Sequence, residues 1–157
     1  MQFIPEITIN QILTNFENEK IYYEYIEKLY NDQKDLMAFI NEENQSLLTD
    51  NEIGILRFLT VVICTSIENH YTLPVITGKM LEDAEENNWS VFHDTEQKSF
   101  NKILDLFFEN YAQEDLLALV EDSIQDDENE EITQVGREII FVAAKSIIDT
   151  LDKNIGN

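Results

Sequence analysis

Only four glycines and two prolines occur among the 157 residues, and this scarcity of helix breakers constrains the fold more than any other feature. Glycine and proline supply the backbone conformations of tight turns, so the chain is poorly suited to a turn-rich β-sandwich. Apolar residues make up 43% of the chain, which is enough for a continuous core. We therefore predict an all-α fold of six to seven helices, packed as one bundle or a two-unit helical repeat within a single domain, 1–157.

Apolar side chains recur at helical spacing along most of the chain. Ile9, Phe16, Tyr23 and Tyr30 follow one another every seven residues, which predicts one long helix from about residue 10 to 30. Thr49, followed three residues later by an acid, has the spacing of a capping box and predicts a helix start. The expected helices cover about 10–30, 33–44, 49–71, 77–88, 94–111, 113–125 and 133–153.

Two stretches of the chain resemble each other. Residues 33–40 read QKDLMAFI and residues 113–120 read QEDLLALV, and the same offset of about 80 pairs Arg57 with Arg137 without a gap. This similarity predicts a tandem duplication, with repeat units 10–71 and 94–153 and a connector over 72–93. The alternative is chance agreement between helices that draw on a narrow set of residue types.

The charge of the chain limits its partners. The 32 acidic and 10 basic side chains give a formal net charge of −22. Such a chain repels phosphate groups, so we expect no direct binding of nucleic acid and none of anionic membranes. A basic protein or a cation is the partner that this field attracts. The alternative is that the charge only keeps the domain in solution.

Acidic side chains concentrate in three places, which are the candidate partner-binding residues. The first lies on the expected helix 77–88, the second on the expected helix 113–125, and the third is the linker between the last two helices. A solvated surface without a partner is the alternative interpretation for each. The residues are Glu82, Asp83, Glu85, Glu86, then Glu114, Asp115, Glu121, Asp122, then Asp126, Asp127, Glu128, Glu130 and Glu131.

Three aromatic residues are candidates for an apolar contact with a partner. Trp89 and Phe92 lie in the expected link between helices, where Trp is either a core plug or an exposed interface anchor. Phe141 falls on the polar stripe of the last helix, so it is either covered by another segment or exposed on a contact face.

No motif for catalysis or for a cofactor is found, and we predict neither. The Glu-x-x-His pairs of di-iron bundles are absent, and the acidic linker lacks the glycine and the glutamate that a calcium loop needs. Cys64 stands alone in an apolar run and is expected to be a buried hydrophobe. With no recognisable signal peptide and no apolar run of the ~20 residues that span a bilayer, the expected location is cytoplasmic.

Three functions therefore compete. The first is an acidic helical protein-binding module, in one version an inhibitor or immunity-type protein for a basic or nucleic-acid-acting partner. The second is a structural homodimer that associates through apolar helix faces. The third, an enzyme or metal protein, is the least supported, because no residue set in the sequence specifies its chemistry.

Overall fold

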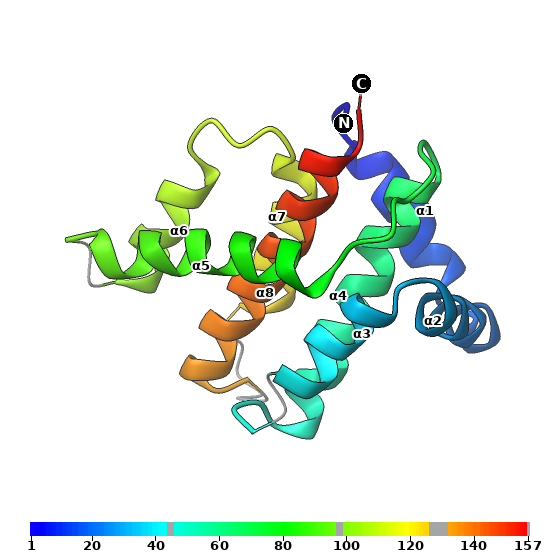
Figure 1. The fold of residues 1–157 in the computed structure, drawn as a ribbon, viewed down its shortest axis with the longest axis horizontal. Helices are drawn as coiled ribbons and strands as arrows, with labels where there is room; N and C mark the ends of the chain where they lie inside the picture. Colours follow the sequence, from blue (N-terminus) through cyan, green and yellow to red (C-terminus); the bar gives the residue numbers. More distant parts are fainter. Residues whose placement is uncertain (44–45, 97–98, 126–131, 157) are drawn as a thin grey trace.

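The computed structural model describes residues 1–43, 46–96, 99–125 and 132–156, and within these ranges the chain is helical without a strand (Figure 1). The prediction of an all-α fold is confirmed, although the eight α-helices in the described ranges exceed the expected six to seven. The elements are α1 Glu6–Asn15, α2 Glu19–Asp32, α3 Lys34–Ala38, the π-helix Phe39–Glu43, α4 Asp50–Glu68, α5 Gly78–Asp94, α6 Phe100–Phe108, α7 Glu114–Ser123 and α8 Gln134–Asn154.

Three of the predicted helix ranges were wrong. The single helix expected over 10–30 is divided into α1 and α2, because the Asn18 side chain accepts a hydrogen bond from the Lys20 N–H at 3.0 Å and begins a new helix there. The expected link after residue 88 is helical, since α5 continues through Trp89 to Asp94. The helix that follows, α6, begins at Phe100 and ends at Phe108, well inside the expected 94–111.

The two longest helices, α4 and α8, pack against each other in the centre of the fold (Figure 1). Both are apolar on most sides and are buried over most of their length, as helices surrounded by other elements should be. Helix α1 packs on α4, α5 crosses α8, and α7 contacts both central helices. Cys64, on α4, is buried in this core.

One buried carboxylate joins the beginnings of the two central helices. Glu52 completes the predicted capping box with Thr49, whose N–H donates to Glu52 Oε1 at 2.9 Å. The other oxygen of Glu52 accepts from the N–H and the hydroxyl of Thr133, the N-cap of α8, at 2.8 and 2.9 Å. Burial opposes the charged form, but these bonds outweigh it and hold the pKa of Glu52 below its ordinary value.

Two glutamine–aspartate pairs hold the extended segments that precede α1 and α5. Gln33 donates to Pro74 O at 2.9 Å and accepts from Ile76 N–H at 3.1 Å, while Asp35 accepts from Gly78 N–H at 2.9 Å.

The second pair repeats this arrangement at the other end of the chain. Gln113 donates to Gln2 O at 3.0 Å and accepts from Ile4 N–H at 3.1 Å, while Asp115 accepts from Glu6 N–H at 2.8 Å. The first pair lies at the start of α3 and holds the segment that leads into α5. The second pair lies at the start of α7 and holds the segment that leads into α1.

Candidate functional site

A groove of about 570 Å³ opens between the second half of α5 and the first turns of α8. It is the candidate site because its lining combines exposed apolar side chains with carboxylates. The segment leading into α4 closes one side of it, and this segment lies beside the beginning of α8 (Figure 1). On both helices the lining positions are three or four residues apart, so they form one stripe on each helix. The lining comprises Leu47, Glu86, Trp89, Ser90, His93, Val135, Glu138 and Ile139.

The floor of the groove is apolar and accessible. Leu47 is 61% exposed and Val135 is 57% exposed, while Trp89 is half-buried and Ile139 is buried. Single exposed apolar residues are common on protein surfaces, but here several lie together in a shallow hollow, which makes the hollow a candidate contact site. The sequence did not predict Leu47, Val135 or Ile139 as site residues, because only the packing brings them to Trp89.

Carboxylates border this floor on both sides. Glu86 on α5 is exposed and Glu138 on α8 is half-exposed, and both contribute to the lining. One turn earlier on α5, Glu82 is exposed and Glu85 is half-exposed, so the predicted acidic cluster of α5 leads directly into the groove. Asp83 differs from these residues, because it pairs with Lys79 at 2.6 Å.

A buried polar network fixes α5 on α8 directly beside Trp89. Asn88, which is buried, donates to Ser146 Oγ and to Asp149 Oδ2, both at 3.0 Å, and accepts from Lys145 Nζ at 2.9 Å. Lys145 also pairs with Asp149 at 2.8 Å. A buried amide with all of its groups bonded determines a single register between two helices, so the groove is held by a rigid support.

Tyr111 extends the network. Its hydroxyl donates to Asp149 Oδ1 at 2.6 Å, and its ring lies 4.6 Å from Lys145 Nζ. Burial and the neighbouring Asp149 raise the pKa of Tyr111 well above its ordinary value, so the phenol stays protonated. These polar groups form their hydrogen bonds with one another, so the network stabilises the packing of α5 on α8. None of its residues lines the groove.

The three predicted aromatic contact residues differ in position. Trp89 lies in the groove, where its ring stacks on His93 with a centroid distance of 6.2 Å. Phe92 is half-buried and packs between Trp89 and α6. Phe141 is completely buried, because Phe100 and Phe107 of α6 cover it. It is therefore covered by another segment, and its side chain offers no surface to a partner.

The predicted acidic residues of α7 do not join this site. Glu114 and Asp122 are exposed, and Asp115 accepts a hydrogen bond from the Glu6 N–H at the start of α1. Burial, with a contribution from Asp122, raises the pKa of Glu121 above its ordinary value. None of the four contributes to the described lining of the groove. The acids of the predicted linker, Asp126, Asp127, Glu128, Glu130 and Glu131, lie outside the described residues.

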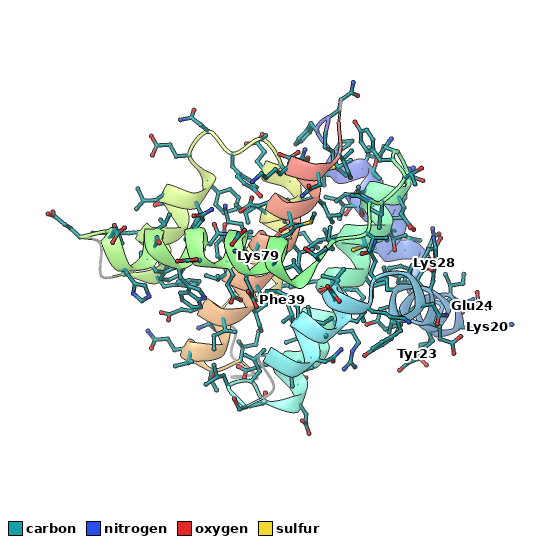
Figure 2. All side chains as sticks on the ribbon, in the orientation of Figure 1. Lys20, Tyr23, Glu24, Lys28, Phe39 and Lys79 are labelled. Carbon is teal, nitrogen blue, oxygen red and sulfur yellow. The ribbon has the colours of Figure 1, made fainter. Side chains whose placement is uncertain are left out.

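Two other surfaces were considered as sites. The outward face of α2 exposes Tyr23, but the helix carries both signs of charge, with Lys20 and Glu24 on the same side of the molecule (Figure 2) and Lys28 paired with Glu68 at 2.9 Å. A second hollow, of about 790 Å³, lies between α6, the end of α7 and the start of α8. Its wall continues in sequence into 126–131, outside the described residues, so its shape does not define a ligand.

Catalytic and metal chemistry find little support in the described residues. Among them, no group of three or more His, Cys, Asp or Glu side chains is placed to hold a metal ion. Burial, with Glu68 adding to it, raises the pKa of the Cys64 thiol to about 12, so the thiol is not a nucleophile at neutral pH. In the described part of the chain, no helix has both the length and the apolar character to cross a bilayer.

No protein-family model, curated protein or solved structure matches the chain.

Proposed function

We propose that this chain is a non-catalytic protein-binding module that captures a basic partner protein in the groove between α5 and α8. The observation that carries the proposal is the combination of an accessible apolar floor, around Trp89 and Val135, with carboxylates at its border, Glu86 and Glu138. The net charge of −22 supports it, because the surrounding field steers cations toward the domain.

The two parts of the groove have different roles in this proposal. Long-range attraction raises the association rate, and it weakens with added salt because the Debye length falls to roughly 8 Å at physiological ionic strength. The apolar floor supplies affinity that salt does not remove, since burial of apolar surface contributes about 25 cal/mol per Å². A partner with only basic residues would leave the apolar floor uncovered, and a partner with only apolar residues would leave the carboxylates unpaired.

One version of the proposal is an inhibitor or immunity-type protein. A partner that acts on nucleic acid has a basic surface, and carboxylates on a helix such as α5 present negative charge to it as phosphates do. The module would then occlude the partner's nucleic-acid site. A cytoplasmic location remains a prediction from the sequence.

The test uses two pairs of substitutions with the same change in charge. The immobilised chain should retain a basic protein at low salt and release most of it as salt rises. Glu86→Gln with Glu138→Gln should weaken retention of that protein, whereas Glu19→Gln with Glu24→Gln on the exposed surface of α2 should not. Equal retention by both variants, or release that is independent of salt, would contradict the proposal.

A homodimer is the alternative, and charge disfavours it at this groove. In a two-fold dimer the same patch meets itself, so the Glu86 and Glu138 side chains of both copies would come together. The burial of Phe141 removes the apolar face first considered for such a contact. Sedimentation at high protein concentration tests the alternative, and a dimer that Val135→Glu dissociates would favour it over a basic partner.

We also propose that the fold is a tandem duplication, with units that begin at the segments before α1 and α5. Gln33 and Gln113 support it, because each binds backbone groups two residues apart in an extended segment. Thr49 and Thr133 support it too, since both cap a central helix in the same way. The two N-cap residues are 84 positions apart, so the gapless offset of 80 found in the sequence does not hold at the starts of α4 and α8. In this proposal α5 is the counterpart of α1, whereas the sequence had suggested that residues 72–93 form a connector.

A further inference from the structure

We infer that the segment bound in the groove between α5 and α8 is an amphipathic basic α-helix, with apolar residues on one face and Lys or Arg beside them. This inference rests on the proposed function and specifies its partner. It follows from the spacing of the lining, the lack of a strand edge among the described residues and the charge at the border.

The lining of the groove consists of helical positions on two helices that cross each other. On α5 it includes Glu86, Trp89 and His93, which extend over two turns or about 10 Å at 1.5 Å per residue. On α8 it includes Val135 and Ile139, one turn apart. A third helix placed along α5 presents side chains at i, i+3 or i+4, and i+7, so its spacing matches the two turns of the α5 wall, while Val135 and Ile139 of α8 lie at one point along it.

Within the described residues, the groove offers no strand edge to the backbone of an extended segment. Any polypeptide that enters must keep its N–H and C=O groups hydrogen-bonded, and a strand usually does so by pairing with a sheet edge. The described residues contain no strand. The Ser90 hydroxyl already donates to Glu86 O at 3.0 Å. A helix satisfies its backbone internally, so it can bury apolar side chains here without losing hydrogen bonds.

The charge at the border determines the character of the flanking residues. Glu86 and Glu138 lie on opposite walls, one from each helix. A helix with leucines toward Trp89 places its neighbouring side chains over these carboxylates, and Lys or Arg at those positions would pair with them. A second copy of this chain does not fit, because its own acidic surface would meet the same carboxylates.

The probe for the test is an 18-residue peptide of lysine and leucine with its leucines on one helical face. Its control is a scrambled peptide of identical composition and charge. Trp89 is the only tryptophan of the chain, so its fluorescence reports binding in the groove. We expect the amphipathic peptide to bind at least ~10-fold more tightly than the scrambled one, since only the amphipathic peptide can bury its leucines together on the apolar floor. Carbon chemical shifts of the labelled peptide should become helical on binding.

Two substitutions separate groove binding from general attraction between charges. Val135→Glu adds a negative charge at the groove, and Val75→Glu adds the same charge at a residue that is 70% exposed and outside the groove lining. General attraction would strengthen binding in both variants. We expect Val135→Glu to weaken binding of the amphipathic peptide by roughly 10-fold, as the loss of one buried apolar contact requires, and Val75→Glu to leave it unchanged or slightly stronger. Thermal melts of both variants verify that they are folded.

The outcomes distinguish the two claims. If neither peptide binds at physiological salt, the proposed function itself is contradicted. If both peptides bind equally and Val135→Glu weakens both, the groove is the site but the partner is not a helix. If Val135→Glu and Val75→Glu have the same effect, the groove is not the binding site.

Discussion

Replacing Gly136 by alanine tests the joint between the two central helices. A Cβ atom added at Gly136 would lie 1.8 Å from Glu52 Oε2, a distance that no pair of non-bonded atoms maintains. The carboxylate would have to leave its position, where it accepts the bonds from Thr49 and Thr133. Gly54, on α4, is the matched control, because a Cβ there meets nothing within 4 Å.

The magnitudes follow from these contacts. Glycine in the interior of a helix is less stable than alanine by about 0.5–1 kcal/mol, so Gly54→Ala should raise the free energy of unfolding by that amount. Gly136→Ala should lower it by about 2–4 kcal/mol. The reason is that the displaced Oε2 of Glu52 loses its two bonds from Thr133, at no less than about 1.5 kcal/mol each, and the same gain in helix propensity offsets part of this loss.

A double-mutant cycle measured by urea unfolding separates the causes. Glu52→Ala alone should destabilise the chain by about 2–4 kcal/mol, because the N-terminal N–H groups of both helices lose their acceptor. In that background the space beside Gly136 is empty, so adding Gly136→Ala should be neutral or stabilising. Equal destabilisation by Gly136→Ala with and without Glu52, or a Gly136→Ala variant as stable as Gly54→Ala, would refute the reasoning.

The remaining predictions concern pH and buried amides. The lowered pKa of Glu52 means that its contribution to stability is present above about pH 4.5 and is lost as pH falls through the folded-state value; Glu52→Gln should therefore flatten the acid limb of a pH–stability curve. Gln33→Leu and Gln113→Leu should each lower the free energy of unfolding by about 2–4 kcal/mol in urea titrations, since each leaves a buried N–H and a C=O without a partner, and a variant as stable as the parent chain would contradict this role. Asn88→Ala should loosen α5, shift the Trp89 emission and lower the melting temperature, and an unchanged emission would contradict its positioning role.

Local signals in the sequence predicted the fold class and several helix boundaries. The capping box of Thr49 and Glu52 was found because its bonds join residues three positions apart. The burial of Cys64 was predicted because it lies in an apolar run. The break at Asn18 was missed, since the seven-residue apolar repeat continues across it and gives no sign of a change in direction.

Contacts between distant residues explain what the sequence could not predict. The hydrogen bonds that Thr133 donates to Glu52 join residues 81 positions apart, and no local pattern around either residue predicts its partner. The groove is a similar case, because Leu47 and Val135 are ordinary apolar residues until the fold places them beside Trp89. The acids of α5 were predicted as a cluster, but only the structure distinguishes Glu86, at the groove, from acids that bond within the fold.

The most direct test of the account is a map of where a basic amphipathic helix binds. Backbone amide shifts of the labelled chain can be followed while the lysine–leucine peptide is added. We predict that the shifts concentrate at Leu47, over 86–93 of α5 and over 135–139 of α8. Shifts centred on the outward face of α2 around Tyr23, which lies at the far side of the molecule from the end of α5 (Figure 2), or spread evenly over all acidic surfaces, would contradict it.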